Sequence, residues 1–199
     1  ARAQEQYAAH GITTIQDGMA VEEMFPMYQM LLDSGILKLD LVVYPSPQAY
    51  DAAAERFGAL PPERHLRIGG MKVYLDGSPQ GRTAWMREPY AGEADYRGYG
   101  TMEDAALEEA MELACLRRTQ LLCHCNGDGA AEQFLRCLAR VEQKHPEMAQ
   151  LRPVIIHGQL LAPDQLPRVK ELGAVVSFFV AHVYHWGDVH LRNFGPERA

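Results

Sequence analysis

The stretch QLLCHCNGDGAAEQFLRCLARVEQKHPEMAQLRPVIIHGQ, residues 120–159, decides the expected fold. It opens with an apolar run of strand length at 120–128, continues with an amphipathic helical pattern over 129–144, and closes with a second apolar strand at 153–159. Two strands joined by one helix favour a parallel crossover, in which the helix packs back against the strands.

The same alternation extends in both directions along the chain. Further strands are expected at 11–18, 39–46, 69–78 and 174–182, and further helices at the start of the chain and near 21–34, 47–57, 102–118 and 163–172. This order implies an α/β fold with a parallel sheet, either an open doubly wound sheet or a (β/α)₈ barrel. No glycine-rich phosphate loop follows any strand, which favours the barrel, although six strands cannot close it.

The composition excludes several classes of protein. The chain has 199 residues, of which 47% are hydrophobic and 23% charged, as is typical of a globular domain. A formal net charge of −7 without a basic stripe argues against nucleic acid as a partner, and no apolar run approaches the roughly 20 residues of a membrane helix. All four cysteines lie within 115–137, which favours buried thiols in a reducing cytoplasm over disulfides.

Polar side chains gather where the expected strands end, and this end of a barrel carries catalysis. The long segment 76–100 follows the third strand, and loops of such length are usually functional. Because loops are polar in any protein, the two histidines inside apolar strand runs are the more informative residues. The polar residues at the strand ends are Asp17, Ser46, Lys72 to Asp76, His124 to Asp128, His157 with Gln159, and His182 with His185.

Strand alternation places Lys72 on the interior face of the third strand, opposite Met71 and Val73. A bare ammonium is strongly disfavoured inside a barrel. Two explanations remain open: a salt bridge to a carboxylate, or carboxylation by CO₂ to an anionic carbamate that can bridge two metal ions.

The same alternation turns His124 away from Cys123 and Cys125, which argues against a zinc site made by these three residues. His124 and His157 come from consecutive strands, so their imidazoles can share a metal. Core histidines with satisfied hydrogen bonds are the alternative explanation.

Three ordered motifs resemble the amidohydrolase superfamily, and within it amidohydrolase family 3, whose members include proteins similar to N-substituted formamide deformylase. The motifs are VYLDGSPQGRTA after Lys72, HCNGD at His124, and RPVIIHGQLLAPDQLPRVKELG around His157. GITTIQDG and HVYHWGD also resemble segments of that family. The resemblance covers nearly the whole chain and implies that residues 1–199 are the central part of a metal-dependent barrel domain, with strands two to seven of eight.

Carried over, the resemblance makes Lys72 the catalytic carboxylated bridge and metal ligand, and His124 and His157 the ligands after strands five and six. The expected cofactor is one or two divalent ions, most plausibly Zn²⁺. The family's HxH pair is expected before Ala1 and its catalytic aspartate after Ala199, so this span alone should hold metal weakly and lack activity. Ile156 stands where the family usually has Glu, which affects the orientation of His157 and not its identity as a ligand.

The resemblance implies an enzyme that hydrolyses amide-type C–N bonds other than peptide bonds in a small molecule. The candidates for substrate contact are Arg82, His182, His185 and Asp188. Arg82 could instead pair with Asp76, and packing or capping is the alternative for the other three. A non-catalytic or degenerate barrel without metal is the alternative function. Exposed sheet edges would also favour pairing with another copy of the chain.

Overall fold

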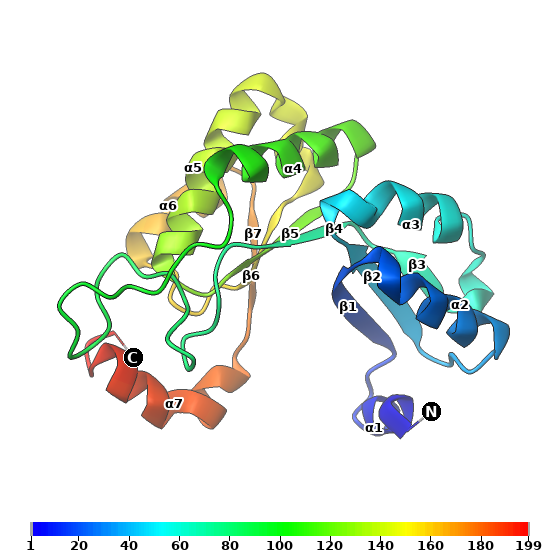
Figure 1. Ribbon diagram of the computed structural model, residues 1–199, viewed down its shortest axis with the longest axis horizontal. Coiled ribbons are helices and arrows are strands. Elements are labelled where there is room, and N and C mark those ends of the chain that lie inside the picture. Colours follow the sequence, from blue (N-terminus) through cyan, green and yellow to red (C-terminus); the bar gives the residue numbers. More distant parts are fainter. Residues whose placement is uncertain (1, 199) are drawn as a thin grey trace. The chain divides into compact units, whose positions relative to one another are not determined.

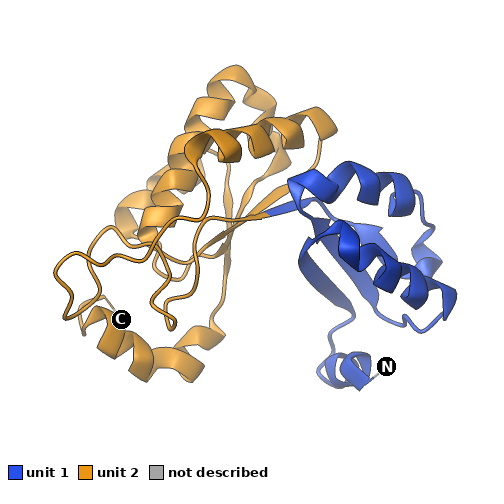
Figure 2. Cartoon of the chain, viewed as in Figure 1, with its two compact units in different colours: residues 1–72 blue, residues 73–199 orange. Residues whose placement is uncertain are grey.

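The computed structural model describes residues 2–198 and divides the chain into two compact units, Ala1–Lys72 and Val73–Ala199 (Figures 1 and 2). The boundary falls inside a strand, β4 (Met71–Tyr74). Each unit has its own parallel sheet covered by helices, and the strands of each sheet follow one another in sequence order.

The first unit contains a three-stranded sheet in the order β1-β2-β3. Both strand pairs are parallel, with Ile15 opposite Leu41 and Leu41 opposite Leu66. The elements are α1 (Arg2–Ala9), β1 (Thr14–Ala20), η1 (Glu22–Met24), α2 (Phe25–Asp33), β2 (Asp40–Pro45), η2 (Pro47–Ala49), α3 (Tyr50–Phe57), η3 (Pro62–Arg64) and β3 (Leu66–Ile68).

Aromatic packing joins the two helices α2 and α3 of the first unit. The rings of Phe25 and Tyr28 from α2 both meet Phe57 of α3 edge to face, with centroids 5.5 and 6.0 Å apart. Ser46 follows β2 and caps the short helix η2 that precedes α3, because its Oγ accepts the N–H of Ala49 at 3.3 Å.

The second unit contains the sheet β4-β5-β6-β7, with parallel pairing of β5 to β6 and of β6 to β7. Helices α4 and α5 lie side by side and cover the strands (Figure 1). The further elements are α4 (Asp104–Arg117), β5 (Leu121–Cys125), α5 (Asp128–Lys144), η4 (Pro146–Leu151), β6 (Val154–His157), η5 (Pro163–Gln165), α6 (Leu166–Glu171), β7 (Val175–Phe178) and α7 (Ala181–Phe194).

The alternation of strands and helices, the parallel pairing and the sequential strand order agree with the sequence-based prediction. Strand periodicity also predicted the burial of Met71, Val73 and Leu75, which are fully buried. None of the described helices is long and apolar enough to cross a membrane.

The strand predicted at 69–78 is wrong in its bounds, because the chain forms two short strands around Gly69 and Gly70. β3 ends before this pair and β4 begins after it, and the two strands belong to different sheets. A side chain at Gly69 would collide with Val42 and Tyr44, since a Cβ there would lie 2.4 Å from Val42 Cγ1. The side chains of β2 therefore pack closely against the backbone of Gly69, at the break between β3 and β4.

The strand predicted at 174–182 is also wrong in its second half. β7 ends at Phe178 and the helix α7 begins at Ala181. Three residues of α7 are buried, His182, His190 and Phe194, at a spacing that places them on one helical face. The many aromatic residues around them are also typical of a packed loop, so the helical periodicity of this segment is not evident from the sequence.

Candidate metal and ligand site

A buried carboxylate, Asp76, organises the carboxyl end of the second sheet. Its two oxygens accept three backbone N–H groups, those of Trp85 at 3.0 Å, Asn126 at 3.0 Å and Gly127 at 2.7 Å. Burial raises the pKa of this carboxyl to about 6, and the three N–H groups partly counter that rise. Asp76 thus ties the long loop after β4 to the end of β5.

His124 lies on β5 beside this carboxylate. Its Nε2 is 3.6 Å from an Asp76 oxygen, 3.0 Å from the carbonyl oxygen of Gly77 and 2.9 Å from Nδ2 of Asn126. Cys123 and Cys125, its neighbours in sequence, are completely buried, whereas His124 is half-buried. This difference agrees with the predicted opposite faces, and all four cysteines are buried as expected.

His157 ends β6 next to His124. The two imidazole rings meet edge to face with their centroids 4.7 Å apart. The backbone of His157 has φ of 75°, a left-handed conformation that costs an ordinary residue about 1–2 kcal/mol. Such strain is concentrated at functional sites, because the surrounding structure must impose it.

Lys72 is buried, with 5% of its surface exposed, and lies in the first unit. Its Cε would lie 4.0 Å from a Cβ added at Gly18 of β1, so the aliphatic stem runs beside that strand. The expected convergence of Lys72 with His124 and His157 stays a prediction.

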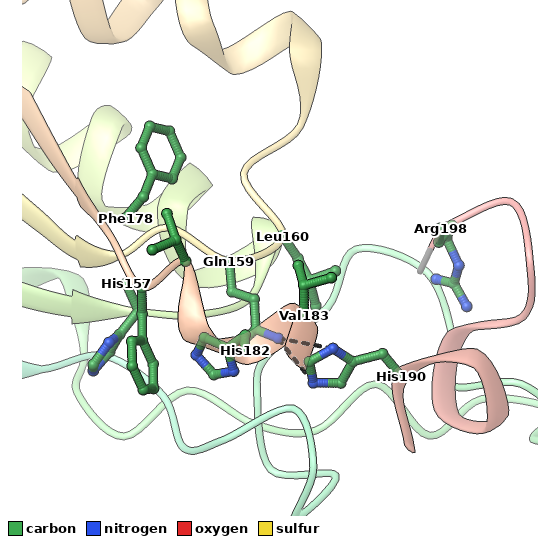
Figure 3. A pocket seen from close by; sticks show the side chains of 10 residues that line it. His157, Gln159, Leu160, Phe178, His182, Val183, His190 and Arg198 are labelled. Atoms are coloured by element: carbon green, nitrogen blue, oxygen red, sulfur yellow. Dashed lines mark hydrogen bonds between the residues drawn. The ribbon is translucent and has the colours of Figure 1, made fainter. Parts of the chain in front are cut away.

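A cavity of about 250 Å³ opens beside His157, between the end of β6 and helix α7 (Figure 3). His182 lies between His157 and His190, and Nε2 of Gln159 lies 2.8 Å from His190 Nε2. Burial lowers the pKa of both His182 and His190, so both imidazoles are neutral at pH 7. The lining residues are His157, Gln159, Leu160, Phe178, Phe179, Val180, His182, Val183, His190 and Arg198.

The four residues expected to contact substrate lie in different settings. His182 lines this cavity, whereas His185 and Asp188 are exposed on α7 and do not line it. Arg82 pairs with Glu93 at 2.7 Å and lies over the ring of Tyr90, so its ion-pair partner is Glu93 and not Asp76.

Two residues of the cavity, His190 and Gln159, are not among the site residues predicted from the sequence. Their signal is present in the sequence as the eight-residue spacing from His182 to His190, which places both on one face of a helix, but it is recognisable only once 181–194 is known to be helical.

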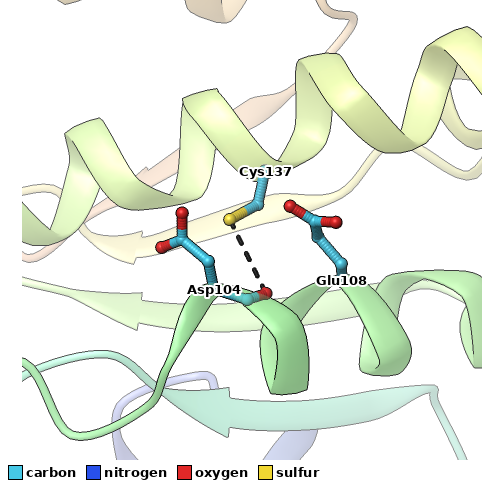
Figure 4. A group of neighbouring side chains, drawn as sticks. All are labelled: Asp104, Glu108 and Cys137. Carbon is cyan, nitrogen blue, oxygen red and sulfur yellow. Dashed lines mark hydrogen bonds between the residues drawn. The ribbon is translucent and has the colours of Figure 1, made fainter.

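A second group of metal-binding residue types consists of Asp104 and Glu108 of α4 and Cys137 of α5 (Figure 4). Asp104 accepts hydrogen bonds from Arg136 and Arg140, which hold the pKa of its carboxyl well below the usual range. Burial and the nearby carboxylates raise the pKa of the Cys137 thiol to about 12, whereas a metal ligand must be a thiolate. We interpret this group as an ion-pair network that joins the two helices.

The geometry on the β5 and β6 ends is that of a parallel α/β protein with two adjacent histidines at the carboxyl ends of neighbouring strands. The chain belongs to the amidohydrolase family, whose model matches residues 1–199. It is 27% identical over 125 residues to the putative amidohydrolase YtcJ of Bacillus subtilis (strain 168), a match that covers 61% of this chain and 23% of that protein.

Two solved structures are similar to this chain over almost its whole length. An uncharacterised metal-dependent hydrolase from Pyrococcus furiosus superposes with a TM-score of 0.82 at 28% identity, over 99% of this chain and 40% of that one. Its counterpart from Pyrococcus horikoshii OT3 gives 0.80 at 26% identity, over 99% of this chain and 39% of that one. The α/β chain is therefore part of a (β/α)₈ barrel, as predicted, and it spans less than half the length of these relatives.

Proposed function

We propose that this chain carries part of the active site of a metal-dependent hydrolase that cleaves amide-type C–N bonds in small molecules. The observation that carries the proposal is the pair His124 and His157, whose rings lie 4.7 Å apart at the ends of neighbouring strands. Family membership and the resemblance to metal-dependent hydrolases support the reaction class.

The donor set fits a divalent metal, and zinc is the ion we propose. Two adjacent imidazoles are ligands that zinc prefers. A histidine that binds metal usually donates its other ring N–H to a carbonyl or carboxylate, which fixes the ring. The contacts of His124 Nε2 with the Gly77 carbonyl and with Asp76 match this pattern, so His124 would bind through Nδ1.

The metal, when bound, would lower the pKa of a water molecule so that hydroxide is available near neutral pH. Lys72 would supply the third donor as a carbamate and would count as catalytic for that reason. His124 and His157 would hold the ion. His182 is the best placed of the proposed substrate contacts, and we retain Arg82, His185 and Asp188 as weaker candidates.

The surroundings of the protein are part of the same proposal. Four buried cysteines support a reducing cytoplasm as its location. A small molecule is the proposed substrate, and a homo-oligomer is the proposed assembly state.

Metal analysis tests the proposal. In a zinc titration the protein should bind zinc, although weakly because only part of the family's ligand set lies in this span, and His124→Ala and His157→Ala should each lower the zinc affinity at least about tenfold. His185→Ala, which changes an exposed histidine on α7, is the matched control and should leave the zinc affinity unchanged.

Carboxylation of Lys72 has its own readout. A carbamate carbon should appear in the ¹³C NMR spectrum after labelling with ¹³C-bicarbonate and should disappear in Lys72→Ala. Zinc that persists in both histidine variants would refute the ligand set. No measurable zinc binding would instead favour the non-catalytic barrel, and tight stoichiometric zinc would mean that other residues complete the ligand set.

A further inference from the structure

The imidazole of His182 is buried without hydrogen bonds. Only 5% of the residue is exposed, yet within residues 2–198 neither Nδ1 nor Nε2 has a hydrogen-bond partner. Leaving a buried polar group unpaired costs about 1–3 kcal/mol. Oε1 of the neighbouring Gln159 is buried and unpartnered as well. The cavity therefore presents unsatisfied donor and acceptor capacity to whatever enters it.

The opposite wall of the cavity is apolar. It is built by Leu160, by Phe178 to Val180 around the end of β7 and by Val183 of α7, and Phe178 and Val183 are exposed to solvent. The ring of Phe179 packs edge to face against His182, with centroids 4.3 Å apart. A flat group can lie between this wall and the imidazoles, because an apolar cavity of roughly 150 Å³ already accepts benzene and this one measures about 250 Å³.

The part of the cavity beside His182 does not offer an anion a charged partner. Arg198, the one arginine in the lining, lies apart from His182 in Figure 3, and three of its five N–H groups are used: Nε donates to the carbonyl of Phe194, Nη1 to that of Glu88 and Nη2 to that of Pro89. A carboxylate beside His182 would lose its hydration without gaining a salt bridge. A neutral group with a donor and an acceptor at its edge would satisfy His182 at no such cost.

We propose that this cavity binds a neutral, flat, aryl or heteroaryl substituent with an amide-like edge, which His182 and Gln159 recognise through hydrogen bonds. Because His157 lies at the same cavity, a substituent held there would lie beside the proposed metal site. The identification of this group as part of the substrate rests on the proposed hydrolase function. The binding of the group itself does not.

Three probes of one shape test the chemistry: benzamide, benzoate and toluene. Each is titrated into the protein, in EDTA, while the ring signals of ¹³C-labelled histidines are followed by NMR. Benzamide should shift the His182 signal and bind about tenfold more tightly than either of the others, since one to two buried hydrogen bonds are gained. Equal binding of benzamide and toluene would reduce the cavity to an apolar patch, and preferred binding of benzoate would make it an anion site; either result overturns the proposal.

Variants of two residues on the same helix complete the test. His182→Phe keeps the size and removes the hydrogen bonds, so benzamide should lose about tenfold in affinity while toluene is unchanged. His182→Gln keeps a donor and an acceptor and should restore most of the preference. Tyr184→Phe, on the exposed side of α7, should leave all three affinities unchanged.

If His182→Phe does not fold, Gln159→Leu takes its place with the same expected loss, and unchanged benzamide binding in a folded variant refutes the assignment. Since EDTA removes any metal, a failure here is distinguishable from a failure of the zinc analysis.

Discussion

The left-handed backbone of His157 predicts an inverted order of stability between two substitutions. His157→Gly removes the imidazole and also relieves the strain at φ of 75°, whereas His157→Ala removes the imidazole and keeps the strain. The two variants lose the same ring contacts with His124, so their difference isolates the backbone. We expect the glycine variant to be the more stable, which is the reverse of the usual order.

The magnitude follows from two opposing contributions. A left-handed conformation costs alanine about 1–2 kcal/mol, whereas glycine adopts it freely. Glycine in turn has a more disordered unfolded state, which costs about 0.4–1 kcal/mol. The net preference for glycine at 157 should be roughly 0.5–1 kcal/mol, or about 1–4 °C in Tm for a chain of this length.

His124 provides the matched control pair, because it lies within the extended strand β5. There alanine should be more stable than glycine by about 0.5–1 kcal/mol. The assay is urea denaturation of the four variants in EDTA, so that loss of a metal does not contribute to the measured free energy of unfolding. A His157→Ala variant as stable as His157→Gly would refute the claim of backbone strain at this site.

Three further predictions concern groups outside the histidine pair. Because the pKa of Asp76 is raised in the folded state, the stability that it confers should be fully present below pH about 3.8 and lost as pH rises through about 6. Between pH 4 and pH 7, urea denaturation should show that the free energy of unfolding declines by up to about 3 kcal/mol relative to Asp76→Asn. A constant difference between the two proteins would contradict this prediction. Asp104→Ala should lower the free energy of unfolding by about 1–2 kcal/mol through loss of its hydrogen bonds to Arg136. Cys137→Ser should leave the zinc content unchanged, and a loss of zinc would instead make Asp104, Glu108 and Cys137 a metal site. Arg82→Gln should destabilise the protein by about 1 kcal/mol through loss of its ion pair and ring contact, and a large rise in KM without loss of stability would instead assign it to the substrate.

The alternation of apolar strands with amphipathic helices was sufficient to predict the parallel order of the strands. Short-range periodicity also predicted local facts, such as the burial of Met71 and Val73 and the opposite faces of Cys123 and His124. These properties depend on neighbours a few residues apart, so a single sequence carries them. The amidohydrolase family could likewise be recognised from ordered motifs, since each motif is local.

The tertiary structure alone decided which distant residues meet. Asp76 finds its backbone donors at Asn126 and Gly127, and Gln159 meets His190 only because 181–194 folds as a helix that returns to the end of β6. The strained φ of His157 belongs to the same category, because a non-glycine residue adopts it only when its surroundings impose it. Local pattern therefore determined the elements, whereas burial and partners depend on contacts between residues far apart in the chain, which no local pattern encodes.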